Sequence, residues 1–270
     1  MDFVNRNAGF LTSAAEFHTI AGDAEPPEIL EDAAMTTTIR PFNRPRAGGQ
    51  PAYLDPGYKS TAKRAPKRPP IALEHTLSEV TGPVFAGGWA GPDAADLTRG
   101  HGGPPLGERM ILAGRVLDED GRPVAGTLIE LWQCNAAGRY KHPVDQHDAP
   151  LDPNFDGLGQ VVTGAGGEYR FLTIKPGAYP WRNTYNAWRP AHLHLGIYGP
   201  AFATRLITQM YFPGDPLLAY DPIFQSTPDR AARDRLIADY DPELSEAEWA
   251  LGYRFDIVLR GRAQTPMERA

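Results

Sequence analysis

The chain has 270 residues, enough for one large domain or two modest ones, and its net charge of −6 disfavours a nucleic acid as partner, since phosphate binding favours a basic surface. Its single cysteine excludes an internal disulfide and favours a reducing cytoplasm. The N-terminus does not resemble a secretory signal, and no segment approaches the ~18 apolar residues of a membrane span, so we expect no membrane partner.

The first hundred residues differ in composition from the rest. We expect residues 1–50 to be a poorly ordered or non-native extension, since they are polar and weakly periodic, and Met35 opens a stretch typical of an ordinary protein start. Residues 51–106 are rich in Pro and Gly and are predicted to be an arm that packs on the core and on a partner chain. Their basic run at 58–70 is interpreted as part of that arm or as a solvated face, with nucleic-acid binding as the alternative.

Residues 107–270 are predicted to form the catalytic β-sandwich domain. Strand-like segments at 109–118 and 127–135 flank a turn, as do those at 159–164 and 168–174, which we interpret as two hairpins. Further strands are predicted at 191–199, 204–212 and 253–261. One helix is predicted over 229–240, with Thr227 as its N-cap. This pattern indicates a mainly β fold: an antiparallel β-sandwich or barrel with few short helices and long loops at 139–159 and 177–190.

A candidate metal site begins with His192 and His194, which alternation along a strand places on one face. Tyr140 and Tyr179 each follow a neighbouring predicted strand. Tyrosinate is a hard anionic donor, so these residue types favour ferric iron over zinc or copper(I). The alternative is that the histidines are surface or core residues and that the tyrosines pack. His142 and His147 would compete as ligands, although their polar loop indicates solvation.

Several segments together resemble the intradiol ring-cleavage dioxygenases from about Tyr58 to the C-terminus. They are GRVLDEDGRPVAGTLIELWQCNAAGRY, APLDPNF, TIKPGAYPWRN, WRPAHLHLGIYGP, LITQMYFPGDP and YRFDIVLRG. The resemblance implies a mononuclear non-haem Fe(III) centre whose ligands are Tyr140, Tyr179, His192 and His194. It further implies that Tyr179 leaves the metal when a diol binds.

The same resemblance implies roles for residues around the metal. Arg189 would stabilise developing negative charge on the ring, and Gln209 would line the pocket and hydrogen-bond Arg189 or oxygen species. Trp181 is expected to contact the ring and Tyr58 the substrate carboxylate. The alternative for Arg189 is an exposed cation, and that for Gln209 is a buried residue of a strand. For Trp181 and Tyr58 the alternative is ordinary aromatic packing.

The activity implied is cleavage of an aromatic diol by O2 between its two hydroxyl-bearing carbons, as in aromatic catabolism through the β-ketoadipate pathway. No helical N-terminal region is evident, which favours the branch that converts protocatechuate (3,4-dihydroxybenzoate) to 3-carboxy-cis,cis-muconate. That branch implies that this is the iron-binding beta subunit and that a homologous alpha subunit completes the pocket. The alternatives are a homodimeric enzyme for catechol or hydroxyquinol, and a non-catalytic β-sandwich binding module.

Overall fold

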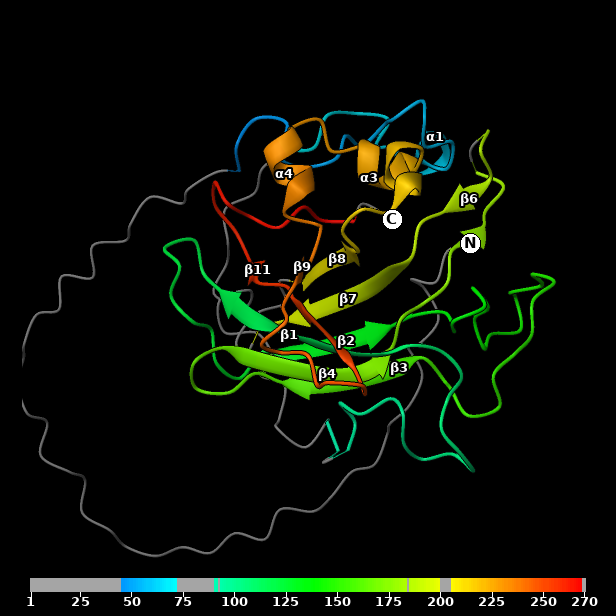
Figure 1. The fold of residues 1–270 in the computed structure, drawn as a ribbon. Helices are drawn as coiled ribbons and strands as arrows, with labels where there is room; N and C mark the ends of the chain where they lie inside the picture. Colours follow the sequence, from blue (N-terminus) through cyan, green and yellow to red (C-terminus); the bar gives the residue numbers. More distant parts are fainter. Residues whose placement is uncertain (1–44, 72–89, 92, 184, 200–204, 269–270) are drawn as a thin grey trace, which may run out of the picture. The chain divides into compact units, whose positions relative to one another are not determined.

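Two open β-sheets carry the fold, and a computed structural model describes them within residues 45–71, 90–91, 93–183, 185–199 and 205–268 (Figure 1). The described residues belong to one unit, 43–270. The predicted N-terminal extension lies outside the described residues as far as residue 44. The division into an arm at 51–106 and a domain at 107–270 stays a prediction.

The first sheet is built around the long strand β1, which has partners on both sides. It pairs antiparallel with β4 and parallel with β10 and β11, and β10 pairs with β9. The fold is thus mainly β, as predicted, but this sheet is mixed rather than wholly antiparallel. The bounds are Arg109–Leu117 (β1), Glu168–Ile174 (β4), Asp239–Tyr240 (β9), Leu251–Arg254 (β10) and Ile257–Val258 (β11).

The second sheet has four antiparallel strands in the order β3-β2-β7-β8, and a separate two-stranded ribbon pairs β5 with β6. The bounds are Leu128–Trp132 (β2), Leu158–Val162 (β3), Tyr179–Pro180 (β5), Trp188–Arg189 (β6), His192–Tyr198 (β7) and Arg205–Tyr211 (β8). The loop expected at 177–190 therefore contains this ribbon.

Side chains from both sheets meet in one core cluster. Leu112 and Phe171 come from the first sheet, and Leu131, Leu193 and Leu195 from the second. β7 has buried residues on both faces, and it lies inside its sheet between β2 and β8. This packing fixes the strand that carries both candidate histidine ligands.

The two predicted hairpins are wrong, although both turns exist. The backbone NH of Val124 does donate to the carbonyl of Val116 (2.9 Å), so the chain turns back on β1. Gly126, with φ of +68°, then redirects it, and β2 pairs with β3 and β7 instead. β3 and β4 likewise belong to different sheets. Turn chemistry specifies a reversal of the chain, not the sheet that the next strand joins.

The predicted helix is shorter than expected, and its N-cap is different. α4 spans Arg230–Asp234, and the side chain of Asp229, not Thr227, accepts a hydrogen bond from Ala232 N (3.1 Å). The helix ends because the backbone of Leu236 and Ala238 bonds to Tyr211 at the end of β8. Other short helices are Thr61–Arg64 (α1), Pro216–Ala219 (η1) and Pro222–Gln225 (α3). Figure 1 shows α3 and α4 on the side of the sheets next to β8.

The N-terminal segment 45–71, called the arm from here on, makes hydrogen bonds to three distant parts of the chain. Gly48 O accepts from Asp229 N (2.9 Å), Gln50 Oε1 accepts from Met267 N (2.7 Å), and Asn183 Oδ1 accepts from Ser60 N (3.0 Å). Within the part of the chain that the structure describes, no helix is both long and apolar enough to cross a membrane.

Candidate metal centre

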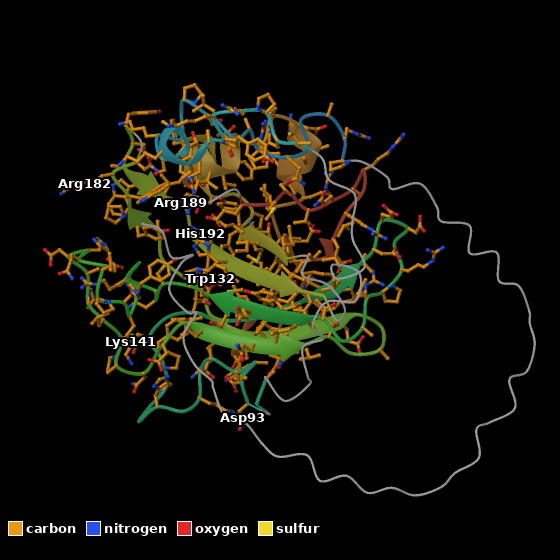
Figure 2. The ribbon with its side chains drawn as sticks, turned by 180° about the vertical axis from the view of Figure 1, so that it is seen from behind. Asp93, Trp132, Lys141, Arg182, Arg189 and His192 are labelled. Atoms are coloured by element: carbon orange, nitrogen blue, oxygen red, sulfur yellow. The ribbon has the colours of Figure 1, made fainter. Side chains whose placement is uncertain are left out.

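Strand β7 places its two histidines on one face, as the alternation predicts. The ring centroids of His192 and His194 lie 4.9 Å apart. His194 pairs across the sheet with Trp132 on one side and with Gln209 on the other. The Trp132 ring stacks on His194 at 5.0 Å with an interplanar angle of 6°. Figure 2 shows His192 and Trp132 close together beside the strands, with Arg189 next to them.

Two glycines bring the tyrosine-bearing segments together. Gly138 has φ of +79°, and a Cβ there would lie 2.3 Å from Ala178 O; one on Gly177 would lie 2.4 Å from Ala136 O. Only glycine allows the two backbones this close. The segments are also bonded, since Gly177 N donates to Asn135 O (3.0 Å). As a result, the rings of Tyr140 and Tyr179 meet edge to face, with centroids 5.6 Å apart.

The tyrosine pair and the histidine pair meet where Tyr179 lies next to His192. Tyr179 OH lies 3.3 Å from His192 Nε2, and the two ring centroids are 5.4 Å apart. Donor atoms at about 2 Å from one metal ion and at right angles are separated by about 3 Å. The distance therefore suits neighbouring ligands of one ion. Tyr140 contacts Tyr179, and His194 contacts His192, so the four rings form one continuous cluster.

Hydrogen bonds at Nδ1 fix the tautomer of both imidazole rings, and Nε2 of His192 faces Tyr179 OH and Arg189 Nη1. His192 Nδ1 lies 2.7 Å from Pro190 O, and His194 Nδ1 lies 3.2 Å from Glu268 Oε2. A carbonyl or carboxylate partner requires a proton on Nδ1, which leaves the lone pair on Nε2. Burial, and then the charge of Arg189, lowers the pKa of His192 well below its usual value, so this ring is neutral and able to ligate.

The two tyrosines and two histidines fit a metal ion that is hard and strongly Lewis-acidic. Burial raises the pKa of Tyr179 to about 12, and burial together with Tyr179 raises the pKa of Tyr140 well above 10. A bound cation reverses this effect by stabilising the deprotonated ligand. Among the described residues, no group of three or more His, Cys, Asp or Glu side chains could hold a metal, so the usual zinc and facial-triad sets are not offered there.

Arg189 lies beside the four candidate ligands and is held by buried partners. It faces Tyr179 across the β5–β6 ribbon, and its Nη1 lies 3.1 Å from His192 Nε2. The expected hydrogen bond to Gln209 is present, from Arg189 Nη2 to Gln209 Oε1 at 2.6 Å. Arg189 Nη2 also lies 2.9 Å from Asp221 Oδ2. The guanidinium is therefore fixed, and its positive charge is available at the metal centre.

Trp181 and Tyr58 extend the site towards the arm. The Arg189 guanidinium lies 5.5 Å from the Trp181 ring centroid, and Trp181 meets Tyr58 edge to face at 5.5 Å. Arg64 lies 4.9 Å over the Tyr58 ring. All eight candidate residues are thus joined by contacts, whereas His142 is exposed and makes a local bond to Val144 N. The assignment of their roles stays a prediction.

Sequence reasoning missed four residues of this site: Arg64, Tyr211, Asp221 and Glu268. Tyr211 OH lies 3.0 Å from Arg189 Nη2. Burial alone would raise the pKa of Glu268, but His194, Gln209 and Arg189 outweigh it and hold this pKa below its usual value. The sequence signal for Arg64 is its place in the basic run at 58–70. The signal for Asp221 is its place before Pro222, a pattern typical of a helix start. Glu268 offered none, since it is 74 residues from His194.

Comparisons with known proteins identify the family of the chain. Family models for "Dioxygenase" and "Protocatechuate 3,4-dioxygenase beta subunit N terminal" match residues 80–261 and 42–76. The chain is 61% identical to the protocatechuate 3,4-dioxygenase beta chain of Burkholderia cepacia over 81% of this chain and 94% of that one. It is 35% identical to the hydroxyquinol 1,2-dioxygenase of Rhizobium sp. (strain MTP-10005), over 50% of this chain and 45% of that enzyme.

Among solved structures, the catechol 1,2-dioxygenase of Acinetobacter sp. ADP1 matches 63% of this chain and 58% of its own, at 26% identity and a TM-score of 0.46. The Dioxygenase model covers most of the chain, and the similarity to the Burkholderia cepacia protein extends over nearly all of that relative. The chain is an enzyme and belongs to the intradiol ring-cleavage dioxygenase family.

Proposed function

We propose that this chain is the iron-binding beta subunit of an enzyme that cleaves protocatechuate with O2 to 3-carboxy-cis,cis-muconate. The observation that supports the proposal is the ring cluster of Tyr140, Tyr179, His192 and His194 at the start of β7, with Tyr179 OH 3.3 Å from His192 Nε2. These four side chains would hold one Fe(III) ion. When bound, ferric iron supplies Lewis acidity that draws electron density from a chelated diol.

Tyr179 is the candidate proton acceptor. It lies on the two-stranded β5–β6 ribbon rather than inside either sheet, so it can turn away from the metal with less loss of packing than the histidines. Burial raises its pKa to about 12, so its phenolate is a strong base when no cation stabilises it. A released Tyr179 phenolate would take one proton from a diol hydroxyl group.

Arg189 is the candidate electrostatic group. Its side chain is 2% exposed and is paired with Asp221, which is 0% exposed, so its position is fixed before substrate arrives. A preorganised positive charge stabilises negative charge that develops on the ring during the reaction. Gln209 and Tyr211 help to hold the guanidinium at this place.

Arg64 and Tyr58 favour a substrate that carries a ring carboxylate. Within the described residues, Arg64 Nε and Nη2 are buried and have no hydrogen-bond partner. The guanidinium lies over the ring of Tyr58, which in turn contacts Trp181. A carboxylate bound here would satisfy these donors through charge-assisted hydrogen bonds. Catechol and hydroxyquinol have no carboxylate to offer.

We further propose a homologous alpha subunit as partner and the bacterial cytoplasm as location. Residues 42–76 match the N-terminal family model of a beta subunit. This match supports the existence of a partner, because a beta subunit implies a second type of chain. The single cysteine supports a reducing location.

The decisive experiment measures O2 uptake and product formation by the chain alone and with a candidate alpha subunit. We expect turnover of protocatechuate only when both chains are present, one O2 consumed per ring and 3-carboxymuconate as product. A homodimer that turns over catechol or hydroxyquinol faster than protocatechuate would support the competing assignment and overturn ours.

A further inference from the structure

Glu268 makes a contact with the candidate metal centre that neither the motifs nor the proposed reaction uses. Its Oε2 lies 3.2 Å from His194 Nδ1, and the two side chains are 11% and 12% exposed. The Nδ1 atom is on the opposite side of the ring from Nε2, the atom that would bind iron. Glu268 would therefore touch a ligand without touching the metal or the substrate.

The segment that carries Glu268 is attached to the sheet edge beside β7. Glu268 N donates to Ile207 O (2.7 Å), and Thr208 Oγ1 donates to Pro266 O (2.8 Å), so two consecutive residues of β8 bind this segment. Met267 N also donates to Gln50 Oε1 of the arm (2.7 Å). These hydrogen bonds fix the backbone that carries the Glu268 carboxylate.

Trp132 restrains the same imidazole from its face. The indole stacks on His194 with nearly parallel planes, at 5.0 Å between centroids. The stacking fixes the plane of the ring, and the carboxylate fixes its rotation within that plane and its tautomer. Together they would hold Nε2 aimed at the metal with little rotational freedom.

The charges around the site give Glu268 a second effect. Arg189 is paired with Asp221, so Glu268 is the carboxylate in contact with His194. Ferric iron bound by two tyrosinates carries one net positive charge. Glu268 would balance it at close range in a buried site, where charge pairs interact strongly.

We propose that Glu268 is a positioning residue for the metal: it holds His194 in the Nδ1–H tautomer and strengthens its bond to iron. This inference rests on the proposed iron site. Carboxylate partners of metal-bound histidines make the imidazole a better donor, and their loss typically costs about 10–100-fold in metal affinity. Because a better histidine donor makes ferric iron less electron-poor, Glu268 should also tune the tyrosinate-to-iron absorption band.

The test compares Glu268→Gln, Glu268→Ala and Glu268→Asp in the full chain, purified together with its alpha partner. Glu268→Gln keeps the side chain's size but removes its charge, whereas Glu268→Asp keeps the charge. Two readouts are used: loss of iron to a competing chelator and the position of the visible absorption band. We expect Gln and Ala to release iron about 10–100-fold more readily and to move the band to longer wavelength, with Asp partly restoring both.

Two control variants separate the carboxylate from the segment that carries it. Glu246→Gln removes an exposed carboxylate that pairs with Arg170 and should change neither readout. Thr208→Val removes the bond to Pro266 and should lower the midpoint of thermal unfolding without moving the band. A band that moves equally in Thr208→Val and Glu268→Gln would assign the effect to docking of the segment and overturn the proposal.

Iron binding by the wild-type protein separates a failure of the iron site from a failure of the role of Glu268. Wild-type protein that binds no iron would refute the proposed function, and this inference with it. Wild-type protein that binds iron, together with Glu268→Gln and Glu268→Ala variants that match it in both readouts, would refute the role of Glu268 alone.

Discussion

Arg189 and Asp221 form a buried ion pair beside the candidate metal centre, with Arg189 Nη2 2.9 Å and Nε 3.0 Å from the two carboxylate oxygens of Asp221. Asp221 also begins a helix, because its side chain accepts a hydrogen bond from Phe224 N in α3. One carboxylate therefore links the start of α3 to the buried cation beside the candidate metal centre.

Replacing Asp221 by Asn should destabilise the protein and impair catalysis. The Asn side chain can still cap α3, but Arg189 loses its buried counter-charge, which typically costs about 3–5 kcal/mol. We expect a lower unfolding midpoint in guanidinium chloride and a lower kcat/KM. Asp234→Asn, which removes the charge of an exposed partner of Arg230, is the control and should leave both unchanged. An Asp221→Asn variant as stable as wild type would show that the pair does not support the fold.

Gly177→Ala should separate the two tyrosine-bearing segments. The new Cβ would lie 2.4 Å from Ala136 O, so one backbone must move, and overpacking of this kind costs about 1–3 kcal/mol. The expected result is less iron per chain and a weaker visible band. Gly102→Ala, where a Cβ meets nothing within 4 Å, is the control. Normal iron content in Gly177→Ala would mean that the close approach is not required for the site.

Arg64→Gln should lower kcat/KM for protocatechuate but not for catechol. A charge-assisted hydrogen bond to a carboxylate contributes about 1.5–3 kcal/mol, which corresponds to a loss of about 10–100-fold. Steady-state O2 uptake with both substrates measures this selectivity, and Arg68→Gln, exposed on the same arm, serves as the control. An equal loss on both substrates would indicate a structural role for Arg64 instead.

Cys134 should be inert in the folded protein. Burial raises the pKa of its thiol to about 12, so at pH 8 the thiol is protonated, and the side chain is 1% exposed. A raised folded pKa contributes stability below the unfolded pKa of about 8.5, and this contribution is lost as the pH rises towards 12. Labelling by a thiol reagent at pH 8 should therefore require denaturant. Rapid labelling of native protein would contradict the burial of this residue.

The sequence predicted those features that depend on local periodicity. The alternation along residues 191–199 placed His192 and His194 on one face, and the structure confirms that their rings are adjacent. Most predicted strands exist within a few residues of their predicted bounds. Tyr140 and Tyr179 are candidates because each follows a predicted strand, but only the resemblance implies that they are ligands, since spacing alone does not show that their segments meet at Gly138 and Gly177.

Features set by long-range pairing were missed or predicted wrongly. The turns after β1 and β3 were interpreted as hairpins, yet each connects two different sheets, since a turn does not specify the partner of the next strand. The helix over 229–240 stops at Asp234 because the following backbone pairs with Tyr211. Asp221 and Glu268 reach the site from segments distant in sequence, and their contacts depend wholly on the tertiary fold.

The central claim is that two tyrosines and two histidines hold one ferric ion, and metal analysis combined with visible spectroscopy tests it most directly. We predict about one iron per chain, a visible tyrosinate-to-iron band that changes when protocatechuate is added, and loss of both in His192→Ala but not in the loop variant His142→Ala. A colourless wild-type protein that takes up no iron, or a His192→Ala variant with full iron content, would contradict the account.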